Sequence, residues 1–323
     1  MNVYVVGAGA VGTYIGDRLR ETGASVTYAP RAAADVVPVE ADLAIVAVKA
    51  FDTDAAIDTL RRALGPASDA TILTPQNGVG NEERLAAAFG ADRIVSCALT
   101  VPVERAADGS VVAANRGGIA LAPVGSVPHN WLVAAFERTT IPVRVVSDYR
   151  ALKWSKLALN IIANASCAIL DVLPATLVTL EGMFALEIRA VRETRAVMAK
   201  LGLAPLDLPR YPVRALFAAA SLPGPAARLV LARRIAGARG RKAPSLLLDI
   251  RAGKGRTEVG VLNGAVAAAG AAAGVATPVN AAFARVLGDI AAFPDLRASF
   301  RERPAALQAE VEVDDLLRSA VAS

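Results

Sequence analysis

The chain has 323 residues, of which 54% are hydrophobic and 20% are charged, and it carries a net charge of +5. This balance excludes a disordered protein, and the length predicts two globular domains. There are two cysteines and one histidine, which argues against a disulfide framework, a zinc site and histidine acid–base catalysis.

The sequence predicts neither a targeting signal nor a membrane span. Met1 runs directly into an apolar, β-branched segment, and the longest apolar stretches are interrupted by polar or small residues. Basic residues gather between Arg228 and Arg256, but no aromatic residues are interleaved with them. A solvated helix face, or a field that attracts anionic ligands, is therefore favoured over nucleic-acid binding. We expect a cytoplasmic protein that binds neither nucleic acid nor a membrane.

The first part of the chain, residues 1–147, is predicted to be a Rossmann-type α/β domain. Short β-branched segments alternate there with helical patterns, which is typical of a parallel sheet with helices on its faces. The segment from Val101 to Pro123 has alternating patterns separated by glycine turns, which predicts an antiparallel meander. The other expected strands are Asn2–Val6, Ser25–Ala29, Leu43–Val48, Thr71–Thr74, Ile94–Ala98 and a last one near Pro142–Val146.

A glycine-rich turn directly follows the first predicted strand. It has the spacing G-x-G-x-x-G and opens an amphipathic helical pattern that ends near Gly23. In this context the first glycine permits a tight turn, the second lets a pyrophosphate approach the backbone, and the third lets helix and strand pack closely. The N–H groups at the helix start would then hold the phosphates. The residues predicted to bind a dinucleotide are Gly7, Ala8, Gly9, Ala10, Val11 and Gly12.

The end of the second predicted strand favours NADP(H) over NAD(H). An NAD site places an acidic side chain there to bind the ribose hydroxyls, but this sequence reads Tyr28-Ala29-Pro30-Arg31. A guanidinium can hold a 2′-phosphate through charge-assisted hydrogen bonds. We therefore expect Arg31 to bind the 2′-phosphate, with a solvated loop arginine as the alternative.

Polar residues also follow the third and fourth predicted strands, where Lys49 and Asn77 stand. Ligands of open parallel sheets bind at the carboxyl ends of the strands. We expect both side chains to face the cofactor crevice and to contact the nicotinamide ribose or the substrate. Isolated polar loop residues are the alternative.

After Asp148 the strand patterns give way to Ala/Leu-rich helical patterns, so residues 148–323 are predicted to form an all-α domain. Lys156, Asn160 and Asn164 are spaced i, i+4 and i+8, which predicts a polar stripe on one apolar helix. Burying such groups without partners costs roughly a few kcal/mol each, so the stripe is expected to face a wet cleft or a polar ligand. A structural polar network between helices is the alternative.

Two further polar residues complete the candidate site. Ser245 directly precedes an apolar run, and Glu258 lies in the segment from Thr257 to Gly264. Read alone, Glu258 predicts a helix-start acid that is stabilised by the helix dipole. Sequence spacing does not bring it to Lys156.

Taken together, these motifs resemble the ketopantoate reductase family, also called 2-dehydropantoate 2-reductases. The resemblance spans nearly the whole chain. The motifs that carry it are Gly7–Gly12, Lys49-Ala50-Phe51, Gln76-Asn77-Gly78-Val79-Gly80, Trp154-Ser155-Lys156-Leu157-Ala158-Leu159-Asn160 and Thr257-Glu258 with Leu262-Asn263-Gly264.

The resemblance implies reduction of the 2-oxo acid ketopantoate to pantoate by a hydride from NADPH. It assigns Lys156 as the proton donor and places Glu258 at the interdomain catalytic site. The chemistry agrees, because hydride addition leaves an alkoxide, and an ammonium can both protonate it and stabilise its charge. The helical domain is expected to serve substrate binding and dimerisation, so a homodimer is one expected assembly. The residues with implied substrate contacts are Asn77, Lys156, Asn160, Asn164 and Ser245.

Three alternatives remain open from the sequence, and one of them is a protein whose basic residues bind an anionic polymer such as nucleic acid. A family member that reduces a different 2-oxo acid or ketone would share these motifs. A non-catalytic NADP(H)-binding regulator would share the cofactor motifs, although it would not need Lys156 as a proton donor.

Overall fold

The computed structural model describes residues 1–106, 108–126, 128–239 and 242–322. The chain forms two compact units: a first unit of Met1–Lys156 with Leu206–Pro212, and a second unit of Leu157–Pro205 with the residues from Val213 onward. The expected division after residue 147 precedes helix α5 (Tyr149–Ile161), whereas the two units divide within this helix. Residues of one continuous helix therefore belong to both units.

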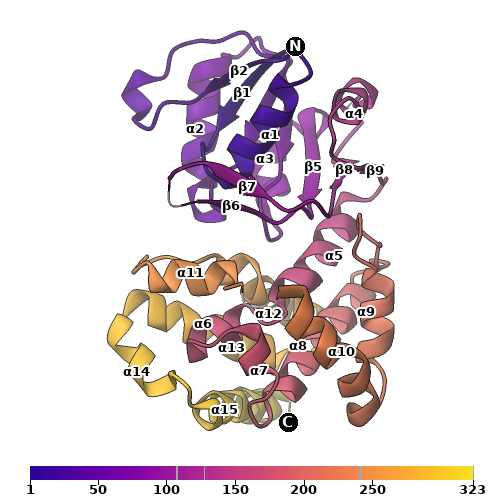
Figure 1. Ribbon diagram of the computed structural model, residues 1–323, viewed down its shortest axis with the longest axis vertical. Helices are drawn as coiled ribbons and strands as arrows, with labels where there is room; N and C mark the ends of the chain where they lie inside the picture. The colour runs from indigo at the N-terminus through magenta and orange to yellow at the C-terminus, as the bar shows by residue number, and fades with distance from the viewer. Residues whose placement is uncertain (107, 127, 240–241, 323) are drawn as a thin grey trace. The chain divides into compact units, whose positions relative to one another are not determined.

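The first unit is built on a mixed seven-stranded sheet, most of whose strands are labelled in Figure 1. All neighbouring pairs are parallel except β5 and β8, which run antiparallel. The expected Rossmann-type α/β class is therefore confirmed for this unit. Across the sheet the order is β2 (Ser25–Tyr28), β1 (Asn2–Val6), β3 (Leu43–Val46), β4 (Thr71–Thr74), β5 (Ile94–Leu99), β8 (Ile119–Pro123) and β9 (Val143–Val145).

Helices cover both faces of this sheet. In β1, Val3 and Val5 join the core on one face, whereas Tyr4 and Val6 join the core on the other. Because both faces are covered, β3 and β5 are buried along their whole length. The helices are α1 (Ala10–Arg20) and α4 (Asn130–Glu137) on the first face, and α2 (Thr53–Leu64) and α3 (Asn81–Phe89) on the second, with short 3-10 turns at η1 (Ala33–Asp35), η2 (Ala50–Asp52) and η3 (Ala91–Arg93).

The segment predicted as one meander forms a hairpin and a separate sheet strand. Among the described strands, β6 (Val103–Arg105) and β7 (Val111–Ala113) pair with each other, and β8 joins the main sheet beside β5. The chain turns sharply before β8 at Gly117, where φ is +99° and a Cβ atom would lie 2.5 Å from the carbonyl oxygen of Thr100. The prediction of a single meander was wrong, because this turn returns the chain to the main sheet.

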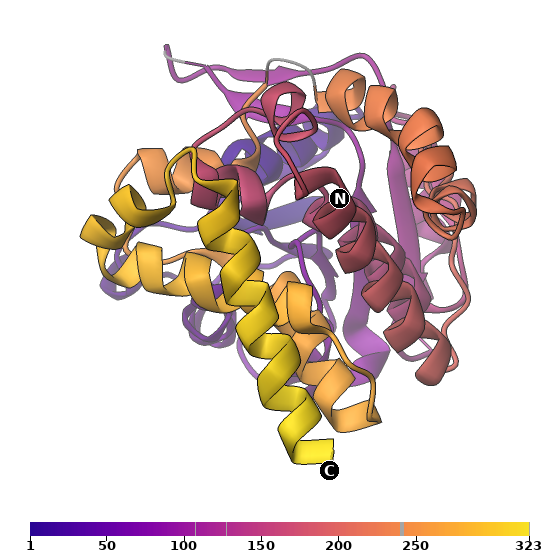
Figure 2. The same ribbon diagram turned by 90° about the horizontal axis from the view of Figure 1, so that it is seen from below.

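The second unit is helical, as expected, and the structure describes no strand in it. Helix α13 packs against α6, α12 and α15, and Figure 2 shows α15 running beside it. None of the described helices is long and apolar enough to span a membrane. Besides the end of α5, the elements are α6 (Ala165–Leu170), α7 (Pro174–Leu177), α8 (Met183–Lys200), α9 (Val213–Ala220), α10 (Gly224–Arg239), α11 (Ser245–Arg251), η4 (Glu258–Val261), α12 (Asn263–Ala273), α13 (Pro278–Ala292), η5 (Pro294–Leu296), α14 (Arg297–Phe300) and α15 (Pro304–Ala322).

A short segment, Leu206–Pro212, returns the chain to the first unit. Thr100 Oγ1 donates a hydrogen bond of 3.0 Å to the carbonyl oxygen of Pro209. Arg144 donates one of 2.6 Å to the carbonyl oxygen of Asp207. These contacts fasten the segment to the β5 and β9 side of the sheet.

Candidate active site

The glycine-rich turn has the geometry that its spacing predicts. Gly7 follows β1 with a φ of +108°, and a Cβ atom there would lie 2.7 Å from the backbone of Ala47. A Cβ atom on Gly12 would lie 2.1 Å from the carbonyl oxygen of Gly7. Around a Cβ atom built on Gly9, by contrast, no atom lies within 4 Å. Two of the glycines therefore allow close packing, and the middle one faces open space that a ligand can enter.

The start of α1 fits the pyrophosphate of a dinucleotide. Gly9 is the N-cap of this helix, no side chain caps it, and its first turn carries no acidic residue. Ala8 and Gly9 are exposed, and Ala10 and Val11 are half-buried. Backbone N–H groups and the helix dipole favour an anion at such a position.

A cation that the sequence analysis missed lies beside this turn. Arg105, at the end of β6, donates hydrogen bonds to the carbonyl oxygen of Ala8 at 2.7 Å and to Thr13 Oγ1 at 3.3 Å. No local pattern could have found this contact, because Arg105 and Ala8 are 97 positions apart. Its guanidinium adds positive charge at the predicted phosphate-binding turn.

Arg31 is the residue that the sequence predicts to contact a 2′-phosphate. It follows β2, which is an edge strand of the described sheet, and its side chain is exposed. Tyr28, Ala29 and Pro30 precede it, so no carboxylate stands at the end of this strand. The position is basic and open to solvent, as a phosphate contact requires.

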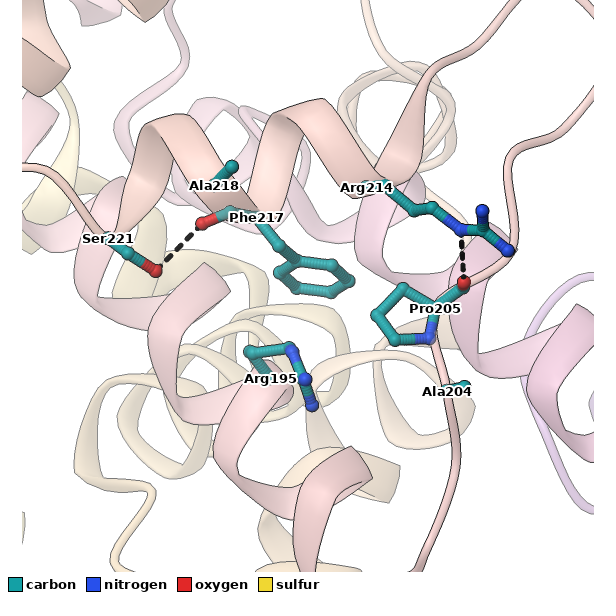
Figure 3. A pocket seen from close by; sticks show the side chains of 7 residues that line it. All are labelled: Arg195, Ala204, Pro205, Arg214, Phe217, Ala218 and Ser221. Atoms are coloured by element: carbon teal, nitrogen blue, oxygen red, sulfur yellow. Dashed lines mark hydrogen bonds between the residues drawn. The ribbon is translucent and has the colours of Figure 1, made fainter.

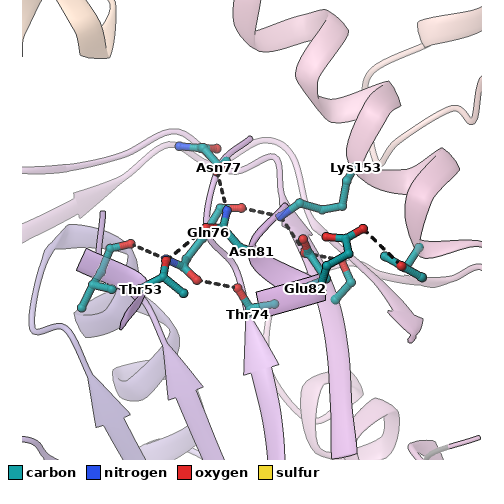
Figure 4. Close-up of polar contacts among 11 residues, drawn as sticks. Thr53, Thr74, Gln76, Asn77, Asn81, Glu82 and Lys153 are labelled. Carbon is teal, nitrogen blue, oxygen red and sulfur yellow. Dashed lines mark hydrogen bonds and ion pairs between the residues drawn. The ribbon is translucent and has the colours of Figure 1, made fainter. Parts of the chain in front are cut away.

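Lys49 and Asn77 follow the neighbouring strands β3 and β4, and both side chains are half-buried. A buried polar network, drawn in Figure 4, connects their loops. The Gln76 side-chain amide donates to the carbonyl oxygen of Val48 at 3.2 Å. The Asn81 amide donates to the carbonyl oxygen of Asn77 at 3.1 Å. The two loops are therefore held in a fixed relation to each other.

A buried ion pair adjoins this network in Figure 4. The Lys153 ammonium on α5 lies 3.0 Å from a carboxylate oxygen of Glu82 on α3, and the two side chains are only 3% and 1% exposed. Lys153 also donates to the carbonyl oxygen of Gln76. Ser96 donates a hydrogen bond of 2.8 Å to the same Glu82 oxygen. The sequence analysis missed this pair, although a second lysine three positions before Lys156 on an apolar helix was a usable signal.

Lys156 lies one turn further along α5 and is half-buried. Its charge acts on Cys97 of β5, whose side chain is fully buried. Burial raises the pKa of the Cys97 thiol to about 12, while the positive charges of Lys153 and Lys156 lower this pKa and the charge of Glu82 raises it. Lys156 belongs to the same unit as Cys97 and the glycine turn.

The expected stripe of Lys156, Asn160 and Asn164 is interrupted. Helix α5 ends before Ala163, which has a φ of +48°, and Asn164 becomes the N-cap of α6. A carboxylate oxygen of Glu187 accepts the Ala163 N–H at 2.6 Å and so holds the break. The prediction that one helix carries all three residues was wrong, because this left-handed residue ends the helix.

The Asn164 side chain connects the end of α5 to α11 within the second unit. It is 3% exposed, and its amide nitrogen donates to the carbonyl oxygen of Asn160 at 2.9 Å. Its oxygen accepts the backbone N–H of Leu246 at 3.1 Å. Leu246 adjoins Ser245, the exposed first residue of α11, so Asn160, Asn164 and Ser245 share one neighbourhood.

Glu258 is buried at the start of η4. Thr257 caps this turn by accepting the backbone N–H of Val259 at 3.4 Å. The first unit carries Gly7 to Gly12, Arg31, Lys49, Asn77 and Lys156, and the second unit carries Asn160, Asn164, Ser245 and Glu258.

A pocket of about 420 Å³ in the second unit contains none of the predicted site residues. Figure 3 shows it between α8 and α9, where the Arg195 guanidinium lies 6.0 Å from the centroid of the Phe217 ring. Arg214 donates a hydrogen bond of 3.0 Å to the carbonyl oxygen of Pro205. The cation–π contact of Arg195 and the hydrogen bond of Arg214 serve local packing, so we assign no reaction to this pocket. In the part of the chain that the structure describes, no cluster of three or more acidic, cysteine or histidine side chains could hold a metal ion.

Known families match most of the chain. The profile of ketopantoate reductase PanE/ApbA matches residues 28–126, and the profile of its C-terminal domain matches residues 148–291. A 2-dehydropantoate 2-reductase of Caulobacter vibrioides is 32% identical over 242 residues, which are 74% of this chain and 74% of the relative. One from Pyrobaculum aerophilum is 29% identical over 238 residues, 74% of this chain and 73% of the relative.

A solved structure of a relative resembles this fold over a larger share of the chain than the sequence matches cover. The PanE/ApbA family ketopantoate reductase of Ralstonia eutropha JMP134 superposes with a TM-score of 0.74 at 28% identity and covers 92% of this chain and 100% of its own. The similarity thus includes the sheet of the first unit and the helices of the second. The chain belongs to the ketopantoate reductase PanE/ApbA family.

Proposed function

We propose that this chain reduces a 2-oxo acid with NADPH, and that the substrate is 2-dehydropantoate (ketopantoate), which becomes pantoate. One observation carries the proposal: the first unit combines a glycine turn that opens at Gly9 with a half-buried lysine, Lys156. Family membership supports an oxidoreductase, and the relatives compared above carry the name 2-dehydropantoate 2-reductase.

The chain's own residues would hold and orient the cofactor. The backbone N–H groups at the start of α1 bind the pyrophosphate, and Arg31 binds the 2′-phosphate. Lys49 and Asn77 contact the nicotinamide ribose at the carboxyl ends of β3 and β4. When bound, NADPH supplies the hydride for the ketone carbon.

Lys156 would supply the proton. Hydride addition places negative charge on the former ketone oxygen, and a neighbouring ammonium stabilises this charge before it transfers a proton from Nζ. We extend the proposal to Asn77, Asn160, Asn164 and Ser245 as substrate contacts and to Glu258 as an acid of the catalytic site. The contacts of Asn164 with Asn160 and Leu246 support this grouping, because they keep Asn160 close to Ser245.

The substrate is tested by following NADPH oxidation with ketopantoate and with smaller and larger 2-oxo acids. We expect the highest kcat/KM with ketopantoate. A higher value with another 2-oxo acid or ketone would reassign the substrate within the family. Tight NADPH binding without turnover of any ketone would favour a regulator instead.

The role of Lys156 predicts a specific kinetic defect. Lys156→Met is expected to lower kcat by about 10²–10⁴, the usual contribution of a positioned acid, with little change in the Kd for NADPH. Steady-state kinetics and cofactor titration measure the two effects. Lys200→Met removes an exposed lysine at the end of α8 and serves as the matched control. Near-normal turnover of Lys156→Met would show that the lysine is structural.

The proposal includes a homodimer and a reducing, cytoplasmic setting. Large apolar side chains of the second unit are exposed, among them Leu229 of α10 at 78% and Leu316 of α15 at 71%. Burial of apolar surface is the dominant favourable contribution to most protein–protein association. Light scattering of the purified protein measures the assembly.

A further inference from the structure

Lys153 contacts two parts of the first unit at once. Its ammonium, carried by α5, pairs with Glu82 at the start of α3 and donates to the carbonyl oxygen of Gln76 in the loop after β4. Gln76 directly precedes Asn77, and Lys153 lies one helical turn before Lys156. The buried ammonium of Lys153 therefore connects the loop that carries Asn77 to the helix that carries Lys156.

The network around this charge is completely buried and extends to the loop that carries Lys49. The Gln76 amide nitrogen donates to Thr53 Oγ1 at 2.9 Å, and Thr74 Oγ1 donates to the Gln76 side-chain oxygen at 3.0 Å. Thr53, Thr74, Gln76, Asn81, Glu82, Ser96 and Lys153 are all buried. An unpaired polar group is costly in such surroundings, so a side chain that shifts must keep its hydrogen bonds by moving its partners with it.

Stability alone does not account for this pair. Removing two charges from water costs more than their attraction commonly returns, and apolar replacements of buried pairs are often neutral or stabilising. An apolar pair, however, could not donate a hydrogen bond to the Gln76 carbonyl oxygen, as Lys153 does.

We infer that Lys153 and Glu82 are a positioning pair, which fixes the Gln76–Asn77 loop against the helix that carries Lys156. The inference rests on the proposed function for its kinetic consequence, because Asn77 and Lys156 are the groups whose alignment matters there. Glu82 holds the Lys153 ammonium in place, and Ser96 orients Glu82. Neither member of the pair touches a reacting atom in this scheme.

A second contact between α5 and α3 provides a matched control. The Tyr149 hydroxyl donates to a Glu83 carboxylate oxygen at 3.2 Å. Tyr149→Phe removes one hydrogen bond between the same two helices but leaves the Gln76 carbonyl contact intact. We expect this variant to keep the wild-type kcat.

The test compares Lys153→Met, Glu82→Gln and the double variant with the wild type. Each single change leaves a buried charge without its partner, so the melting temperature should fall, and it should recover in the double variant. The expected kcat, by contrast, falls about 10- to 100-fold in Lys153→Met and stays low in the double variant, as misplacement of reacting groups commonly costs. Hydrogen exchange of the cofactor-free protein should become faster at residues 77–80 in Lys153→Met and in the double variant.

The outcomes separate the alternatives. Recovery of kcat together with stability in the double variant, or unchanged exchange at residues 77–80, would overturn the positioning role. If the single variants do not fold, the double variant still decides between these results. If the wild type turns over no 2-oxo acid, the proposed function fails, while the exchange measurement still shows whether Lys153 holds the loop.

Discussion

The sheet shields the Cys97 side chain completely from solvent. Its thiol is fully buried in β5, and burial raises its pKa to about 12, so the thiol stays protonated at pH 8. Because the thiolate is the reactive form, we expect native protein to resist a thiol reagent such as Ellman's reagent at pH 8. The absorbance of the released product measures the reaction, and denaturant should release two thiols, since Cys167 is also buried. Rapid labelling of one thiol in the native protein would contradict this burial.

The residues of the candidate site differ in how far the sequence could predict them. The glycine turn and Lys156 follow from local patterns, because their chemistry depends on neighbours a few positions away. Arg105 and Lys153 depend on partners far along the chain, at Ala8 and Glu82, which only the fold brings close. The sequence shows that both residues are charged, but it could not predict their hydrogen-bond partners.

At the scale of elements, the strand–turn–helix unit predicts that alanine at Gly12 destabilises the fold, whereas alanine at Gly9 leaves the stability almost unchanged. In Gly12→Ala the new Cβ would meet the Gly7 carbonyl oxygen at 2.1 Å, so we expect the free energy of unfolding to fall by about 3 kcal/mol, the upper end of the usual cost of overpacking. In Gly9→Ala the new Cβ meets no protein atom, and the φ of −74° suits alanine. Stability should stay within about 1 kcal/mol of the wild type.

The same Gly9→Ala variant should bind NADPH at least about tenfold more weakly, a loss of about 1.4 kcal/mol, because the methyl group occupies the open space at the helix start. Chemical denaturation and cofactor titration measure the two effects separately. Unchanged affinity in Gly9→Ala would mean that the pyrophosphate binds elsewhere.

The sequence predicted elements better than it predicted their ends and partners. The strands β1 and β4 have the expected bounds, because their alternating or fully buried patterns are local. The end of α5 was missed, because it depends on a left-handed Ala163 held by Glu187 from α8. The pairing of β8 with β5 was missed for a related reason, since strand alternation does not specify the partner strand.

For the whole molecule, cofactor binding predicts a gain in thermal stability. A ligand that binds only the folded state at a concentration of 100 Kd stabilises it by about 2.7 kcal/mol. NADPH should therefore raise the melting temperature measured by differential scanning fluorimetry. NADH should do so less at the same concentration, because the charge-assisted contact with the 2′-phosphate is worth about 1.5–3 kcal/mol.

The difference between the two cofactors should depend on Arg31. Arg31→Ala is expected to make the melting-temperature shifts with NADPH and NADH equal. Arg61→Ala, which removes an exposed arginine of α2, should leave the larger shift with NADPH. Equal shifts with both cofactors in the wild type would show that the end of β2 does not select the phosphate.

The return of Leu206–Pro212 to the first unit restricts how this chain can recombine with its relatives. A gene fragment that ends after residue 147 would encode the sheet without Lys156 and without the segment that contacts Thr100 and Arg144. At Gly118 a Cβ atom would lie only 2.7 Å from the Cβ atom of Pro209, so these two distant codons constrain each other. A chimaera that exchanges the first unit must therefore carry two separate stretches of the gene from the same parent.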